Sequence, residues 1–221
     1  MDIKLRRLMP GFVGAALLLL GCPNPNLYTT PRTIQPGRFQ QGVAFETFSY
    51  QQRDGDRATL PALPTMMARY GISDQIDIGG RITALTGFGL DLKWNFLRSQ
   101  TLDLAADPGF QVYPIGFSSG DSGGAVAVGY VNFPLVAGLN LGQHVTLLAS
   151  AGFTWGFGSV TDGDRVGSFA SGAIGRFGVG GNFRLSQSFA LHPEVTVLTP
   201  ADGSVITSFG IGLLLGGMPQ H

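Results

Sequence analysis

His192 and Glu194 are the two side chains of this sequence best spaced for proton transfer. Residues two apart in a β-strand point to the same face, so a strand here would place the imidazole beside the carboxylate. Such a pair can act as a general base, and an enzyme that hydrolyses envelope lipid would need it together with a serine. A histidine satisfied within a packed interior is the commoner role, and we expect that role for His192.

The string Gly120-Asp121-Ser122-Gly123-Gly124 is a second candidate. It resembles the segment around the nucleophile of chymotrypsin-like serine proteases, which implies a base histidine and then an aspartate well upstream of the serine. The histidines of this chain (His144, His192 and His221) all follow Ser122. Clusters of Gly, Asp and Ser are also ordinary loop material. We therefore expect a loop at 120–124, no catalytic residues, and a protein that is not an enzyme.

Metal chemistry has little support in the sequence. The three histidines lack the spacing of metal ligands. Asp162-Gly163-Asp164 has carboxylates at the spacing used in calcium loops, but the remaining ligands of such a loop are missing. An Asp-Gly turn explains this string better, and we expect neither a metal site nor a bound cofactor other than an N-terminal lipid.

The remaining chemistry lies in charged side chains that share one face of the alternating segments described next. Opposite charges on neighbouring antiparallel strands attract, and an unpaired charge in a narrow, partly dehydrated interior is costly. We expect these residues to form a closed network that occludes the interior; the alternative is a narrow channel for small solutes. The residues are Arg69, Asp77, Arg81, Asp91, Lys93, Asp103, Arg176, Arg184, His192 and Glu194.

Period-two alternation, the pattern of β-strands, runs through most of the chain. In Gln75–Ala84, for example, Gln75, Asp77 and Arg81 share one face while Ile76, Ile78 and Ile82 share the other. Most segments have about 10 residues, enough to cross a bilayer at a tilt. The ten expected strands are 38–50, 63–72, 75–84, 88–97, 100–116, 124–138, 143–157, 168–184, 188–199 and 205–216.

The connections between these segments alternate in length. Tight turns are expected at Ser73-Asp74, Arg98-Ser99, 140–142 and Ser186-Gln187, and longer loops at 51–62, 117–123, 158–167 and 200–204, with 85–87 as a short exception. This asymmetry is typical of bacterial outer-membrane barrels. An even number of strands places both termini on the short-turn side, the periplasm. We predict an all-β, antiparallel, up-and-down transmembrane β-barrel of ten strands, with eight as the alternative count.

Composition favours the same class. Charged residues make up 13% of the chain, about half the usual share of a soluble domain, and 34 of 221 residues are glycine. No segment after the N-terminus has the 18 or more apolar residues of a spanning helix. Without residues 1–21 the chain has 11 cations and 13 acids, which argues against a nucleic-acid partner.

The N-terminus reads as a secretory signal peptide over residues 1–21, with Lys4, Arg6 and Arg7 before an apolar run from Phe12 to Leu20. The string Leu19-Leu20-Gly21-Cys22 resembles the lipobox of bacterial lipoproteins, which implies lipidation of Cys22, the chain's one cysteine. We expect the Pro- and Asn-rich residues 22–37 to form an extended periplasmic tether. The barrel would then occupy residues 38–217.

Over residues 38–217 the chain resembles the small outer-membrane β-barrel proteins of Gram-negative bacteria as a class. The resemblance implies outer-membrane lipid, the barrel assembly machinery and the lipoprotein sorting machinery as partners. We expect a structural role, or binding of an unknown ligand through the extracellular loops; a narrow porin-like channel is the first alternative and an envelope-lipid hydrolase the second. The residues expected to face lipid are Phe45, Tyr70, Trp94, Phe96, Tyr130, Phe153, Trp155, Phe157, Phe177, Phe183 and Phe209.

Overall fold

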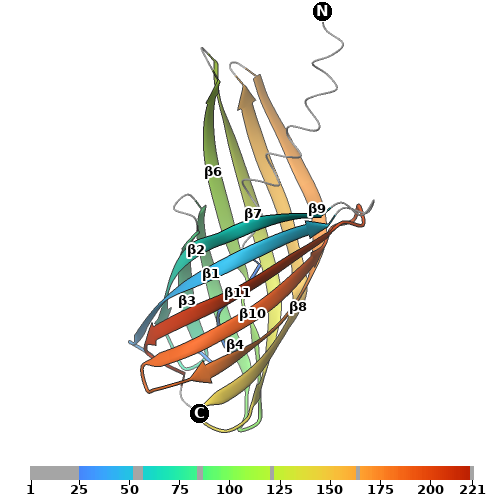
Figure 1. Ribbon diagram of the computed structural model, residues 1–221. Helices are drawn as coiled ribbons and strands as arrows, with labels where there is room; N and C mark the ends of the chain where they lie inside the picture. Colours follow the sequence, from blue (N-terminus) through green and yellow to red (C-terminus); the bar gives the residue numbers. More distant parts are fainter. Residues whose placement is uncertain (1–24, 52–56, 84–86, 120–121, 163–164, 220–221) are drawn as a thin grey trace, which may run out of the picture.

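The computed structural model describes residues 25–51, 57–83, 87–119, 122–162 and 165–219 (Figure 1). Among these residues, no helix is long and apolar enough to cross a membrane. The strands are β1 (Phe39–Gln51), β2 (Arg57–Gly71), β3 (Ile76–Thr83), β4 (Gly87–Arg98), β5 (Leu102–Ala106), β6 (Gly109–Ser119), β7 (Ser122–Asn140), β8 (Val145–Asp162), β9 (Arg165–Arg184), β10 (Phe189–Thr199) and β11 (Val205–Gly216).

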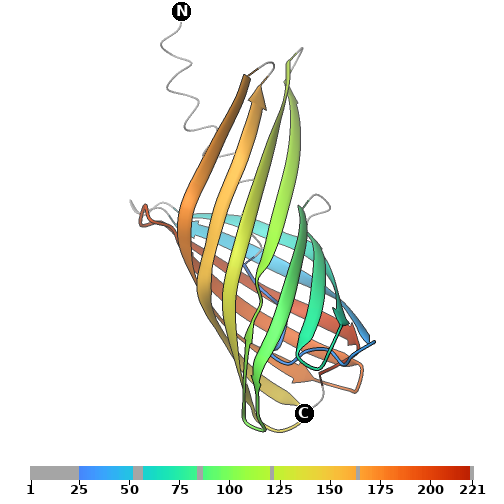
Figure 2. The ribbon, with the colours of Figure 1, turned by 180° about the vertical axis from the view of Figure 1, so that it is seen from behind.

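The strands form one closed antiparallel barrel (Figures 1 and 2). The seam pairs β1 with β11, Gln40 lying opposite Gly216. β5 and β6 lie end to end between β4 and β7 and share one position in the wall. The break between them includes Pro108, which has no N–H to give to a ladder. The wall therefore has ten strand positions, which confirms the predicted count, and the predicted segment 100–116 corresponds to β5 and β6 together.

One end of the barrel has short connections, and we call it the turn end. The β2–β3, β4–β5, β7–β8 and β9–β10 connections all lie there, at the four positions predicted for tight turns. The last described residue, Pro219, lies at this end too, because its carbonyl oxygen accepts a hydrogen bond from Arg184, the last residue of β9. The opposite end, which we call the loop end, has the remaining connections.

The connections at the loop end are more regular than expected. Predicted loops 51–62, 117–123 and 158–167 are largely strand, because ladder pairing continues almost to the tip of each hairpin, with Ser119 opposite Ser122 and Asp162 opposite Arg165. The β6–β7 and β8–β9 hairpins rise well beyond the rest of the wall (Figures 1 and 2). The sequence underestimated these strands because their Gly-, Ser- and Asp-rich ends resemble loops.

Side chains alternate between a buried inner face and an exposed outer face, as in the pattern of β3 and β4. The outer face carries large apolar residues such as Ile78, Leu92 and Phe153, all more than 40% exposed. Tyr130 was expected on this face, which was wrong. It is 7% exposed and packs edge-on against Tyr113, with ring centroids 6.1 Å apart, because its parity in β7 points inward.

The interior has a polar middle between two small apolar clusters. Near the loop end, Ile174, Leu198 and Ile206 pack together with Tyr50. Near the turn end, Ala190, Leu214 and Met218 pack with Met67. The charged side chains line the remaining interior, and two of them, Asp77 and Asp103, lie close to the turn end, each as the second residue of its strand.

Candidate functional site: a charged and plugged barrel interior

The structure places nine of the ten charged or histidine side chains expected in the network inside the barrel, each no more than 8% exposed. These nine come from β2, β3, β4, β5, β9 and β10. The tenth, Arg184, is half-buried at the turn end, where its guanidinium donates to the carbonyl oxygen of Pro219.

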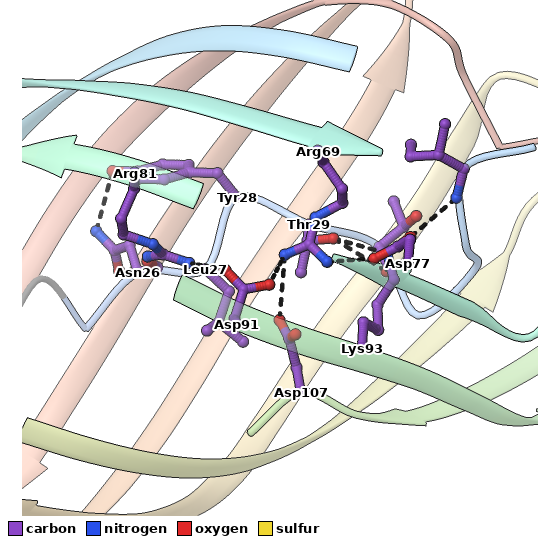
Figure 3. Close-up of polar contacts among 12 residues, drawn as sticks. Asn26, Leu27, Tyr28, Thr29, Arg69, Asp77, Arg81, Asp91, Lys93 and Asp107 are labelled. Atoms are coloured by element: carbon purple, nitrogen blue, oxygen red, sulfur yellow. Dashed lines mark hydrogen bonds and ion pairs between the residues drawn. The ribbon is translucent and has the colours of Figure 1, made fainter. Parts of the chain in front are cut away.

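Arg69 is the centre of the ion-pair network (Figure 3). Its guanidinium pairs with Asp77 on β3 and Asp91 on β4, and lies 3.7 Å from Asp107. Asp91 also faces Arg81, with Nη2 and Oδ2 3.4 Å apart. Gly79 makes the arrangement possible, because a Cβ there would lie 2.5 Å from Asp91 Oδ1. The glycine-rich inner face thus provides room for charged side chains to meet.

Lys93 connects this network to a segment that lies inside the lumen. Its ammonium is fully buried, 3.0 Å from Asp77 Oδ2. It donates three hydrogen bonds of 2.9 Å, to Thr29 Oγ1 and to the carbonyl oxygens of Thr30 and Arg32. A lone buried ammonium is very unfavourable, so this set of acceptors stabilises both the lysine and the segment that provides them.

Residues 25–36, which we call the plug, run through the lumen, and all of residues 25–34 are buried. We expected residues 22–37 to be a tether outside the barrel; the described part instead fills its interior. An extended segment has unpaired backbone groups, and the charged wall supplies their partners. Gly37, with a φ of 73°, then reverses the chain into β1.

Glu194 holds the middle of the plug. Its carboxylate accepts hydrogen bonds from the backbone N–H groups of Leu27 and Tyr28, at 3.0 and 2.8 Å. Tyr28 has a φ of 50°, in the left-handed region that non-glycine residues rarely adopt. Successive N–H groups around a left-handed residue form a concave anion-binding nest, and Glu194 occupies this one. The strained residue and the carboxylate therefore fix each other.

The ring of Tyr28 lies against a groove in β11 that lacks side chains. A Cβ at Gly212 would approach Tyr28 Cδ1 to 2.8 Å, and one at Gly210 would overlap the Tyr28 hydroxyl. Beside the ring, Asn26 Nδ2 donates to Ser208 Oγ at 3.0 Å. The plug therefore fits the wall by shape as well as by charge.

Each end of the plug is held by an arginine. Arg32 Nε donates to Asp103 Oδ2 at 2.6 Å, and its Nη2 donates to the carbonyl oxygen of Ser99. At the other end, Arg176 donates to the carbonyl oxygen of Pro25. Asp103 and Arg176, both expected to join a network within the wall, thus bind the plug, and Asp103 also accepts a hydrogen bond from Asn140 in the wall.

The lumen around Leu27 has almost no free space, whereas a cavity of about 1030 Å³ lies at the turn end, lined by Gln35, His144 and Arg184 among others. Three cavities beside Leu27 measure about 20, 10 and 10 Å³. A cavity needs roughly 10–15 Å³ to hold one water molecule, so these hold one or two waters each at most. At Leu27 the barrel interior is therefore filled, by the plug together with the side chains of the wall.

Of the residues considered for catalysis, His192 and Glu194 lie side by side, whereas Ser122 and His144 lie far apart. His192 Nε2 is 3.5 Å from Glu194 Oε2, and within the described part of the chain neither ring nitrogen has a hydrogen-bond partner. The Tyr28 ring covers His192 edge-on at 5.9 Å. Ser122 is at the tip of the β6–β7 hairpin and His144 is beside the β7–β8 turn, at opposite ends of the barrel.

Several notable positions fall outside the described ranges: Cys22, 120–121, 163–164 and His221. Among the residues that the structure does describe, no group of three or more His, Cys, Asp or Glu side chains is placed to hold a metal ion.

Two buried ionic groups of this site, Asp107 and Arg32, were not predicted from the sequence, and a third, Glu46, was placed on the polar face but left out of the network. Asp107 has the same parity as Asp103 in the predicted segment 100–116, so alternation alone would have placed it on the polar face. Glu46 was on the polar face of the first segment and is fully buried. Arg32 was assigned to the tether and had no such signal. With these, the described part of the chain buries five cations and six acids: Arg32, Arg69, Arg81, Lys93 and Arg176 against Glu46, Asp77, Asp91, Asp103, Asp107 and Glu194.

No protein-family model and no curated protein matches the chain. Solved structures with a similar barrel include the attachment invasion locus protein Ail of Yersinia pestis in complex with a heparin analogue, at 15% identity and a TM-score of 0.47, covering 82% of this chain and 99% of that one. The outer membrane protease OmpT of Escherichia coli has 9% identity, a TM-score of 0.44, and coverage of 83% and 97%. An outer membrane channel of Pseudomonas putida F1 has 10% identity, a TM-score of 0.46, and coverage of 88% and 100%.

Proposed function

We propose that this chain is an outer-membrane lipoprotein whose β-barrel is closed by its own N-terminal segment, with a structural or loop-mediated binding role and no catalytic activity. The plug is the observation that supports this most directly. Ten consecutive buried residues occupy the lumen, and their backbone groups bind wall side chains from β3, β4, β9 and β10. A barrel built this way keeps solutes out at rest.

The outer face supports a membrane location. Its exposed residues include Ile82, Phe88, Leu135, Val179 and Ile211, which come from strands all around the wall. Soluble monomers rarely expose contiguous apolar patches larger than a few hundred Å². A lipid bilayer is the environment in which such a surface is stable, and we propose that the loop end faces outward and the turn end faces the periplasm, as in barrels with this asymmetry.

We propose further that residues 1–21 are removed and that Cys22 receives a lipid, after delivery by lipoprotein sorting and barrel assembly machinery. Cys22→Ala should abolish incorporation of radiolabelled palmitate, while the heat-dependent shift of the folded barrel on a denaturing gel is retained. Incorporation that persists in the Cys22→Ala variant would exclude this site.

Planar-bilayer recordings test the closed-barrel proposal. The mature protein should give no steady single-channel current, whereas a variant lacking residues 26–34 should open discretely, because the lumen loses the segment that fills it. The matched control keeps the plug and fixes it with the pair Asn26→Cys and Ser208→Cys in a Cys22→Ser background, since these side chains already meet at 3.0 Å. Steady current through the disulfide-locked variant would contradict a lumen closed by the plug.

A channel gated by the plug is the second candidate function, and one observation favours it. The plug is held mainly by hydrogen bonds and ion pairs, which water can replace when the segment leaves. In that case the disulfide lock between positions 26 and 208 should suppress currents that reappear on reduction. Hydrolysis of envelope lipid ranks third, because His192 is sealed beneath Tyr28; turnover that is lost in His192→Ala would revive it.

A further inference from the structure

The plug crosses the lumen in one direction, and its N-terminal end lies at the loop end. Asn26 bonds to Ser208, the fourth residue of β11 counted from the loop end, and its carbonyl oxygen accepts from Arg81 Nη1 at 2.8 Å. Pro25 is bound by Arg176, which pairs with Leu198, one residue before β10 ends. Three strands thus place the start of the plug near the loop-end rim.

The C-terminal end of the plug lies at the opposite rim. Thr33 Oγ1 donates to the carbonyl oxygen of Asp74, in the β2–β3 turn, at 2.6 Å. Ile34 N–H donates to Asp77 Oδ2 at 2.9 Å, and Pro36 pairs with Gly71, the last residue of β2. The plug therefore ends among the short turns, directly beside the start of β1.

The contacts between these ends follow the sequence in order. Glu194 binds residues 27 and 28, Lys93 binds residues 29, 30 and 32, and Asp103 binds residue 32. The nine residues from Asn26 to Ile34 span at most about 30 Å when extended, which is close to the thickness of a bilayer's hydrocarbon core. The chain before Pro25 is thus joined to the barrel at the loop end rather than the turn end.

We infer that the mature chain is threaded through its own barrel, so that its N-terminus emerges at the loop end while its C-terminal strand finishes at the turn end. With the orientation given under Proposed function, on which this inference rests, the N-terminus is on the cell surface. Cys22 is three residues before Pro25, a reach of at most about 11 Å. A lipid on Cys22 then inserts into the outer leaflet rather than the periplasmic one.

An epitope scan on intact cells tests the threading. One variant of the full chain has a short epitope between Asn24 and Pro25, which leaves Cys22–Asn24 unchanged. Matched controls have the same epitope after Gly203, in the β10–β11 turn at the loop end, or after Pro219 at the turn end. The N-terminal epitope should stain intact cells as strongly as the Gly203 epitope, whereas the Pro219 epitope should stain only after permeabilisation.

The outcomes distinguish the path of the plug through the barrel from the orientation of the barrel in the membrane. If the N-terminal and Pro219 epitopes behave alike, the threading is wrong, whichever side they are on. If the Pro219 epitope stains intact cells and the other two do not, the threading stands and the proposed orientation fails. Heat-modifiable migration shows that each variant has folded. Because an epitope could pull the plug out, the scan is repeated with Asn26→Cys and Ser208→Cys in a Cys22→Ser background; loss of surface staining upon disulfide formation would also overturn the inference.

Discussion

Lys93→Met should release the plug while leaving the barrel wall intact. Lys93 is fully buried, and its ammonium holds Asp77 at 3.0 Å and three plug acceptors at 2.9 Å. Methionine keeps the volume of the stem but removes every one of these bonds. The Lys93–Asp77 pair lies within the wall, and Asp77 retains Arg69 when that pair is lost. The three hydrogen bonds to the plug are charge-assisted, and we take their combined contribution to docking as about 3 kcal/mol.

A loss of about 3 kcal/mol raises the population of the undocked plug by roughly 100-fold. Hydrogen exchange of the N–H groups of Leu27, Tyr28 and Ile34 measures this directly, because these groups bond to Glu194 and Asp77 only while the plug is docked. Their protection should fall by about two orders of magnitude, whereas amides in the β7–β8 ladder should be unchanged. Single-channel openings should become more frequent in parallel.

Arg98→Met is the matched control, since Arg98 is an exposed cation on the same strand. Lys93→Arg keeps the charge and should lose less protection than Lys93→Met. The reasoning is refuted if plug amides in Lys93→Met exchange at the wild-type rate, because the ammonium would then contribute nothing to docking. It is also refuted if the wall amides lose protection equally, because Lys93 would then stabilise the whole barrel.

Three further predictions follow from other contacts. Gly210→Ala should loosen the plug without removing a charge, since the new Cβ overlaps the Tyr28 hydroxyl, while Gly80→Ala, whose Cβ comes no nearer than 3.5 Å to Leu90, should leave plug exchange unaltered. Phe153→Arg places a charge in the outer face, where the Phe153 and Phe133 rings stack with centroids 4.9 Å apart. The free energy of unfolding from lipid vesicles should fall by about 2–4 kcal/mol. Ser186→Arg, in an exposed turn, should change it little. Hydrogen bonds from Ser204 lower the pKa of Asp202. The ionised carboxylate therefore stabilises the β10–β11 turn at pH values above the ordinary pKa of an aspartate, and this contribution disappears as the pH falls through the lowered pKa. Hydrogen exchange at the Ser204 N–H should rise under acid in the wild type and show no such pH-dependent rise in Asp202→Ala.

The sequence was sufficient for the wall, because a barrel strand must alternate between lipid and lumen along its whole length. Parity alone placed Asp77, Asp91 and Lys93 on one face, and pairing of neighbouring strands brought them together. Parity was overridden for Tyr130, which was assigned to lipid by its residue type although its position in β7 points inward. It also could not show where strands end, since hairpin tips and loops share the same small polar residues.

The plug could not be found in this way because it has no periodicity. Its residues are bound one by one, by side chains distant in sequence, and its prolines and threonines are equally suitable for a solvated linker. The visible clue was on the wall. Glu194, Arg176 and Asp103 were expected to pair within the wall, and each of these binds the plug.

The position of the plug directly before β1 has a consequence for how the protein is made. The β1–β11 seam joins residues as far apart in sequence as Gln40 and Gly216, so its closure is slow and comes after local hairpins have formed. The plug continues through Gly37 into β1, the strand that completes that seam. With so little free volume around Leu27, the wall is best closed around a segment already in place. Because the plug precedes every strand in the sequence, it is exported before the strands that must close around it. A chain that fails to place the plug should stall with its seam open and its edge strands exposed to aggregation.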